Sequence, residues 1–337
     1  MGRGMTAQCS DLRERAERFL RWYPREWRER YGEEFVEFLV AELEEQPRSV
    51  GRTVDVARSG VLARLAALGL AGRSLDSAEH GRRSLAAFGC AVSLFLTSAL
   101  AIWAQLTIGW QWSAPDTAAT VSAMVLMTVA VIAVAAACIG CAVPVAWSAM
   151  RALVLGRPWT IMRPLGLLAA GLAVLIVGTH HFANGWPGTG GHPWSHQGIV
   201  PGGVAAYAWA STLFVTSYWL HPAALGHFPG AEVVWMVASP LALASVVVGA
   251  AKIVRRVDLT DRVLRFERRM GFVTAGAMTL FFAGAALWVV DGGPGPRNLF
   301  HIGFIDVLEL AVMGLSLVLA GRAMERTGEG APGLARR

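Results

Sequence analysis

Charged side chains are scarce in this sequence. Asp, Glu, Lys and Arg make up 16% of the 337 residues, whereas hydrophobic residues make up 54%. Soluble globular domains carry about 25% charged residues, so this composition excludes an ordinary soluble domain. Because the apolar runs are about as long as membrane-spanning helices, the sequence predicts an all-α, polytopic membrane protein with a small amino-terminal cytoplasmic helical module.

Lysine and cysteine are also rare. Lys252 is the only lysine, so arginine supplies nearly all of the positive charge in a chain whose net charge is +6. Arginine collects in the cytoplasmic loops of membrane proteins, and direct nucleic-acid binding is therefore not expected. The few cysteines do not make a disulfide framework. Cys138 and Cys141 form a CxxC inside an apolar run with no histidine nearby, which favours helix packing over metal or redox chemistry.

The usual catalytic signatures are missing. The sequence contains no phosphate-binding glycine loop, no GxSxG and no HExxH motif, so we predict a non-enzymatic protein. No short apolar core follows a basic start, which argues against a cleavable signal peptide. The first 80 or so residues are therefore expected to remain in the cytoplasm.

Six apolar runs have the length that crosses a bilayer, about 20 residues. They are Ser84 to Leu106, Ala118 to Trp147, Ile161 to His180, Ala231 to Val254, Met270 to Val290 and Gly303 to Arg322. Six spans place every arginine-rich segment on one side, which the positive-inside rule assigns to the cytoplasm. We therefore expect a multi-pass protein of the bacterial cell membrane with both termini cytoplasmic. The expected domains are residues 1–83, 84–322 and 323–337.

A seventh run, Val204 to Leu220, is predicted to be a re-entrant or interfacial helix. If it crossed the membrane, the basic loop Lys252 to Arg269 and the basic tail would both lie outside, against the charge rule. That loop alternates basic and apolar residues, so we expect it to form an amphipathic helix on the inner leaflet of the lipid bilayer.

In the first quarter of the chain, apolar residues recur at the spacing that is typical of short amphipathic helices. Tyr23-Pro24 is expected to separate the first helix from the second, because the residue before proline avoids helical geometry. The second helix is expected to end near Gln46-Pro47. Each of the last two helices has one apolar stripe, and these are expected to pack together as a three-helix module. The stripes are Trp27, Tyr31, Phe35, Phe38 or Leu39 and Leu43, and then Val50, Val54, Ala57, Val61, Leu65 and Leu68.

The segment RWYPREWRERYGEEF, Arg21 to Phe35, resembles the permease-prefix segment that precedes membrane domains of bacterial permease-like proteins. It is also similar to the helical signalling domains of membrane proteins linked to PadR-type transcription regulators. The rest resembles an uncharacterised multi-span family of high-GC bacteria, through NGWPGTGGH and GGPGPRNLFH. The resemblance implies a partner-binding module, with a cytoplasmic transcription regulator or a membrane protein as partner. The residues that carry it are Tyr23, Pro24, Trp27, Arg28, Arg30, Tyr31, Gly32 and Glu33.

A loop from Thr179 to Gly203 contains several histidines and no charged residue, and it is predicted to be a shaped loop on the outer face. Imidazoles suit a divalent metal such as zinc, so a metal cofactor is possible there. The candidate ligands are His180, His181, His192 and His196. The alternative is that they make hydrogen bonds at the membrane surface.

Acidic residues inside a span usually face a cavity or a partner, because burying a charge in lipid is costly. Asp306 and Glu309 lie three residues apart in the last predicted span and so share a helix face. The alternative roles are a helix cap for Asp306 and an interhelical hydrogen bond for Glu309. Further candidates for ligand binding or an ion pathway are Asp291, Arg297 and His301.

These observations leave three hypotheses open. The leading one is a sensor or regulatory protein that couples the outer loop to the cytoplasmic module. The second is a transporter or permease component in which Asp306 and Glu309 lie on the path of a proton or cation. The third is a metal-dependent membrane enzyme that uses the outer histidines with Glu309 as base.

Overall fold

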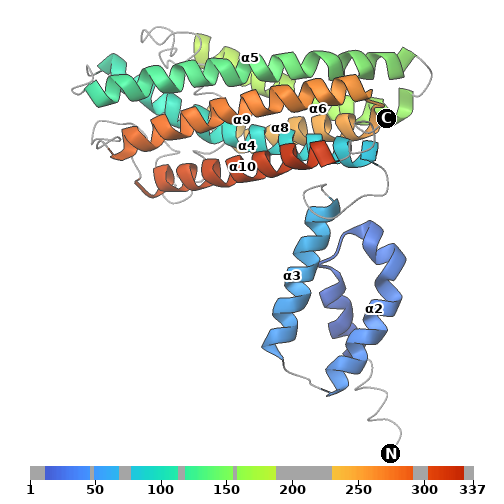
Figure 1. The fold of residues 1–337 in the computed structure, drawn as a ribbon. Coiled ribbons are helices and arrows are strands. Elements are labelled where there is room, and N and C mark those ends of the chain that lie inside the picture. Colours follow the sequence, from blue (N-terminus) through green and yellow to red (C-terminus); the bar gives the residue numbers. More distant parts are fainter. Residues whose placement is uncertain are drawn as a thin grey trace, which may run out of the picture. The chain divides into compact units, whose positions relative to one another are not determined.

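The computed structural model describes residues 12–45, 49–67, 77–112, 118–154, 158–186, 230–290 and 303–329. All regular secondary structure in these ranges is helical, which confirms the all-α prediction. The chain divides into two compact units, Met1–Asp76 and Ser77–Arg337. We call them the module and the membrane unit (Figure 1).

Three helices form the module: residues 12–20, α2 (Arg25–Glu45) and α3 (Val50–Ala67). The predicted break at Tyr23-Pro24 is confirmed, because the first helix ends at residue 20 and α2 begins directly after the proline. The guanidinium of Arg64 in α3 holds this turn. It donates hydrogen bonds to the carbonyl oxygens of Trp22 and Arg21, at 2.8 and 3.0 Å.

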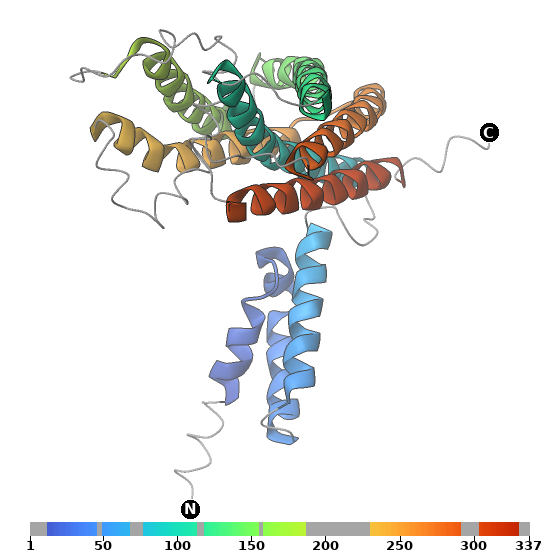
Figure 2. The ribbon, with the colours of Figure 1, turned by 90° about the vertical axis from the view of Figure 1, so that its left-hand side faces the viewer.

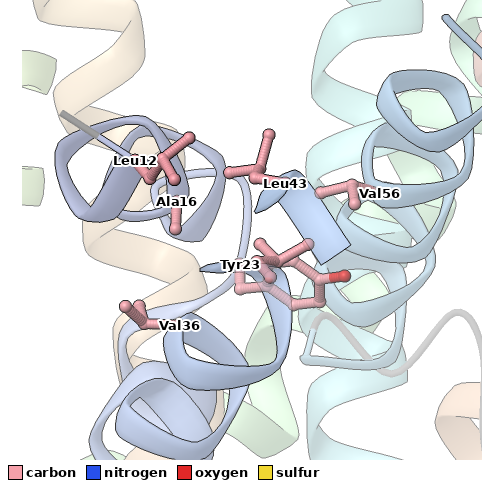
Figure 3. Close-up of a cluster of buried hydrophobic side chains, with 7 residues drawn as sticks. Leu12, Ala16, Tyr23, Val36, Leu43 and Val56 are labelled. Carbon is pink, nitrogen blue, oxygen red and sulfur yellow. The ribbon is translucent and has the colours of Figure 1, made fainter. Parts of the chain in front are cut away.

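The module has a hydrophobic core of its own, drawn in Figure 3. Its buried side chains come from all three helices and are Leu12, Ala16, Tyr23, Val36, Leu39, Leu43 and Val56. Arg52 is buried beside this core and donates a hydrogen bond of 3.0 Å to the carbonyl oxygen of Glu42. Carbonyls in the last turn of a helix lack intrahelical partners, so Arg52 caps the carboxyl end of α2.

The predicted stripe of α3 faces this core only in part, and the expectation is wrong for its three valines. Ala57 and Leu65 are half-buried, and Leu68 lies outside the described residues. Val50, Val54 and Val61 are 81%, 58% and 49% exposed. The buried positions of α3 are instead Arg52, Val56 and Gly60. A Cβ on Gly60 would lie 2.8 Å from Cβ of Trp22, so glycine lets α3 approach the turn closely. This close approach decides which face of α3 packs inward.

The stripe predicted for α2 is correct only in part. Leu39 and Leu43 are buried as expected, and Trp27 and Phe35 pack against the core. Phe38, the alternative to Leu39, is 65% exposed. The core-facing positions of α2 are therefore offset from the aromatic stripe, because Gly32 and Val36 are buried in place of Tyr31.

The membrane unit contains six helices long and apolar enough to cross a membrane, among the described residues. They are α4 (Ser77–Trp112), α5 (Ala118–Val154), α6 (Pro158–Asn184), α8 (Gly230–Arg256), α9 (Asp261–Val290) and α10 (Gly303–Glu329). Each corresponds to one predicted span and extends beyond it at one end or both. The chain is therefore a multi-pass membrane protein with a lipid bilayer as its environment. The seventh run, 204–220, lies outside the described residues.

The six helices pack in nested pairs. The first span α4 packs most extensively on the last, α10, while α5 packs on α9 and α6 on α8. Figures 1 and 2 show the six helices gathered in one bundle. Helix α4 also contacts α8 and α9, so it lies at the centre of the bundle. Helices α5 and α6 contact each other only slightly.

The close contact between α6 and α8 depends on glycine. A Cβ on Gly178 of α6 would lie 1.9 Å from Cε2 of Trp235 in α8. The indole Nε1 of Trp235 donates a 2.8 Å hydrogen bond to the carbonyl oxygen of Val174. Small residues at helix contacts allow close packing in membranes, and here they make room for a buried tryptophan.

The expected amphipathic helix between the fourth and fifth spans is not present as a separate element. Helix α8 continues to Arg256, residues 257–260 form a short turn, and α9 runs unbroken from Asp261. The basic residues thus extend the spanning helices themselves. Arg82 of α4 binds this turn by donating a 2.8 Å hydrogen bond to Asp258. We call this end of the bundle the basic end, and the end that holds His180 the histidine end.

Candidate functional site: an apolar cavity between the spans

A cavity of about 640 Å³ lies within the membrane unit, towards the basic end. Its walls come from α4, α5, α6, α8 and α9, and they are largely aliphatic. Large apolar side chains in the walls include Phe88, Leu96, Val145, Leu165, Val247 and Ile253. This volume is within the range of about 300–1,000 Å³ that small-molecule sites occupy.

The cavity exists because the helices around it present small side chains. Gly89 of α4 contributes no side chain to the wall, and alanines repeat along the facing sides of α5 and α8. These alanines are Ala142, Ala146, Ala149, Ala250 and Ala251. Since α5 and α6 also contact each other only slightly, the bundle leaves space between the α5–α9 pair and the α6–α8 pair.

Glu267 of α9 is the acidic residue in this wall, and it is 1% exposed. The thiol of Cys141 donates a hydrogen bond to its carboxylate. The Oε1 atom of Glu267 is buried and has no hydrogen-bond partner among the described residues. A buried acceptor without a partner is costly, so this oxygen is available to a donor group that enters the cavity.

The other polar wall groups are mostly satisfied. The hydroxyl of Ser93 donates to the carbonyl of Gly89, and that of Thr274 donates to the carbonyl of Met270, both at 2.8 Å. The structure places both cysteines of the CxxC, with Cys90, in the cavity wall as free thiols. The cavity therefore presents one carboxylate in an apolar surface.

At the histidine end, the structure describes only part of the predicted outer loop. His180 and His181 lie in the last turns of α6, with ring centroids 5.5 Å apart. His181 stacks on Trp186 at 5.2 Å. In the part of the chain that the structure describes, no group of three or more His, Cys, Asp or Glu could hold a metal ion. His192 and His196 lie outside the described residues.

Aromatic side chains close the packing between α6 and α8 at this end. The Phe182 ring lies edge-on to both Trp186 and Trp235, at centroid distances of 5.4 and 5.2 Å. Glu232, in the first turn of α8, is buried, and its Oε1 has no hydrogen-bond partner among the described residues. The sequence did not single out Glu232, because it stands at the polar edge of a predicted span.

The acidic pair of the last span is only partly described. Glu309 is 2% exposed within α10. Asp306 lies in the same helix, but its side chain is not described. Asp291, Arg297 and His301 lie outside the described residues, so their predicted grouping with Glu309 stays a prediction.

The predicted partner-binding residues differ in how far they are buried. Tyr23 and Gly32 are buried, and Tyr23 stacks on Trp27 at 4.1 Å. Burial raises the pKa of Tyr23, and a hydrogen bond with Ser59 partly offsets that effect. These residues stabilise the turn. By contrast, the side chains exposed on the surface are Arg28, Arg30, Tyr31 and Glu33, while Pro24 and Trp27 are half-buried.

Sequence reasoning missed Glu267 because arginines surround it in the sequence. An acidic residue in such a segment is normally one of many charged side chains exposed to water. A signal was nevertheless present. Glu267 precedes Gly271, Thr274 and Met278 at intervals of four, three and four residues, and all of these are buried. That spacing extends the inward face of the span through the charged segment.

Compared with protein-family models, with curated proteins and with solved structures, the chain matches none of them. The resemblance of Arg21 to Phe35 to permease prefixes and signalling modules therefore stays a prediction.

Proposed function

We propose that this chain is a non-enzymatic regulatory protein of the bacterial cell membrane. In this proposal the module lies in the cytoplasm and binds a protein partner, and the membrane unit anchors it and receives the signal. The observation that carries the proposal is the apolar stripe of α3, in which Val50, Val54 and Val61 are exposed and Ala57 is half-buried. Contiguous apolar surface on a water-exposed domain marks an interaction site.

The stripe has the geometry that a partner helix requires. Its members are separated by four, three and four residues, which is the spacing of a coiled-coil seam. The core of the module packs on other residues of α3, chiefly Val56 and Gly60. The stripe is therefore not used in folding the module, and it is free to take an α-helix of a second protein.

The resemblance of Arg21 to Phe35 supports a transcription regulator as that partner. A regulator held at the membrane is kept from its DNA, so binding and release would transmit a signal. The outer loop, Thr179 to Gly203, is the proposed receiving site. Its first residues, including His181, pack against Trp186 at the end of α6.

Affinity capture from native membranes tests the proposal with three baits. These are the full chain, the double variant Val54→Asp with Val61→Asp, and the control Glu37→Ala on the exposed surface of α2. We expect a regulator to co-purify with the full chain and the control, and to be lost with the double variant. Direct binding of the purified regulator to each bait must follow the same order. A regulator that binds all three baits equally would refute docking on the stripe.

Transport is the second candidate, because Glu309 is buried within a span and such acids often line ion or proton pathways. The measurement is cation or proton flux into proteoliposomes that contain the full chain, compared with Glu309→Gln. Flux that depends on Glu309 would favour transport. Flux that survives the substitution unchanged would argue against coupling through this residue.

A further inference from the structure

We propose that the cavity at the basic end binds a single membrane-dissolved amphiphile, with an apolar body and a hydrogen-bond-donating head, such as a long-chain amine or alcohol, that meets Glu267. This inference concerns the membrane unit alone and does not depend on the partner proposed for the module.

The volume and the lining of the cavity indicate that the ligand has an apolar body. A volume of about 640 Å³ exceeds what packing defects leave, and mostly aliphatic side chains from α4, α5, α6 and α8 surround it. Protein interiors pack to the density of organic crystals, so a space of this size has an occupant in a membrane. Water is a poor occupant because most wall atoms offer it no hydrogen bond.

The single carboxylate selects the head group. Glu267 accepts a hydrogen bond from the Cys141 thiol and has its Oε1 buried without a partner among the described residues. An ammonium or hydroxyl group would satisfy that oxygen. No Lys or Arg is found among the described residues that line the cavity, so an anionic head would meet a carboxylate without a counter-ion.

The packing of the helices indicates the entry route. Helices α5 and α6 contact each other slightly, and both contribute wall residues, including Val145 and Leu165. The seam between them faces the surroundings of the bundle, with Ile139 of α5 and Met162 of α6 exposed. A ligand dissolved in the bilayer can therefore reach the cavity between α5 and α6 without crossing water.

Thiol protection in phosphatidylcholine nanodiscs tests the proposal, because Cys90, Cys138 and Cys141 all line the cavity. The full chain is treated with a small apolar maleimide, and the labelling rate of each cysteine is read by peptide mass spectrometry. Dodecylamine, dodecanol and dodecanoate are added in turn. Cys9, which belongs to the module, serves as the internal reference.

We expect saturable protection of the cavity cysteines by dodecylamine, weaker protection by dodecanol and the weakest by dodecanoate. Glu267→Gln is expected to raise the half-protecting concentration of dodecylamine about tenfold, the difference between a charge-assisted and a neutral hydrogen bond. The matched control Glu325→Gln removes an exposed carboxylate of α10 at the same end of the bundle and should change nothing.

A pair of variants in α5 tests the space itself. Ala149→Phe places a ring in the cavity and should abolish protection, whereas Ala135→Phe adds the same ring at an exposed position that does not line the cavity. Equal protection by the three amphiphiles in the unmodified chain would overturn the proposed head group. Protection that survives Ala149→Phe would show a general effect of the amphiphile on the bilayer, and would overturn the site.

Discussion

Exposed valines have opposite meanings in the two units of this protein. Val61 of α3 is 49% exposed in the module, and Val143 of α5 is 63% exposed in the membrane unit. In lipid, an outward-facing valine is in its favoured solvent and needs no partner. In water, the same side chain loses hydrophobic free energy until something covers it. Exposure therefore identifies a binding surface only after the solvent of each unit is known.

The two units are also held together differently. Large side chains such as Leu39 and Leu43 fill the core of the module, as in any water-soluble domain. The membrane unit relies instead on glycines that allow backbones and a buried Trp235 to approach closely. Substitutions that add atoms should therefore damage the membrane unit most, and those that remove atoms should damage the module most.

The largest expected effect is that of Gly178→Leu in α6. Its side chain would overlap Trp235 and break the hydrogen bond from Nε1 to the Val174 carbonyl. We expect a destabilisation of about 3 kcal/mol or more, seen as a fall in the yield of monodisperse protein after detergent extraction. Gly166→Leu in the same helix is the control, because a Cβ there meets nothing within 4 Å. Equal losses for both variants would contradict the packing role of Gly178.

The second effect is that of Leu43→Ala in α2. Leu43 is fully buried, so truncation leaves a cavity and should cost the module about 2–5 kcal/mol. Limited proteolysis of the full chain in detergent measures it, as faster cleavage within residues 12–67 with the membrane unit still intact. Phe38→Ala removes a larger but exposed side chain and should leave the cleavage rate unchanged. If both variants accelerate cleavage equally, the module lacks the core described here.

The third prediction compares the same substitution, valine to aspartate, at an exposed position in each of the two units. Val143→Asp places a charge on the lipid-facing side of α5 and should cost about 2.5–3.5 kcal/mol on insertion scales. Val61→Asp lies on the exposed side of α3 and, with the module in water as proposed, should change stability by less than about 0.5 kcal/mol. Membrane-inserted yield and thermal stability of each variant provide the comparison. A large loss from Val61→Asp would mean that lipid or the chain itself covers the stripe.

The smallest effect is expected at the ion pair between Arg82 and Asp258. The 2.8 Å contact joins α4 to the α8–α9 turn, but the Asp258 side chain is 89% exposed. Exposed pairs contribute about 0–1 kcal/mol, so Asp258→Asn should lower thermal stability only slightly. The remaining difference should shrink in high salt because ions screen exposed charges. A loss as large as that of Gly178→Leu would show that the turn is essential to the bundle.

The sequence predicts the membrane unit well because lipid imposes a length and a composition on each span. The spans from Ala118 and Met270 correspond to α5 and α9, and the break at Pro24 follows from local backbone sterics. These features depend on neighbouring residues alone. They can be read without knowledge of the tertiary packing.

The candidate cavity could not be predicted in the same way. It depends on which alanines of α5 and α8 face each other and on how little α5 and α6 touch. The orientation of α3 likewise depends on Gly60 meeting Trp22, a contact between residues far apart in the chain. Periodicity locates an apolar stripe on a helix, but distant contacts decide whether that stripe is covered.

The nested pairing of the helices has a consequence for biosynthesis. Because α4 packs most extensively on α10, its largest contact can form only after α5 to α9 have also been synthesised. The members of the α6–α8 pair lie nearer to each other in the chain, so this pair can associate earlier. A nascent chain that stops before residue 303 would have α4 without its main partner, so the face of α4 that packs on α10 would be open to lipid. Quality-control proteases can then recognise the first span as the mark of an unfinished chain.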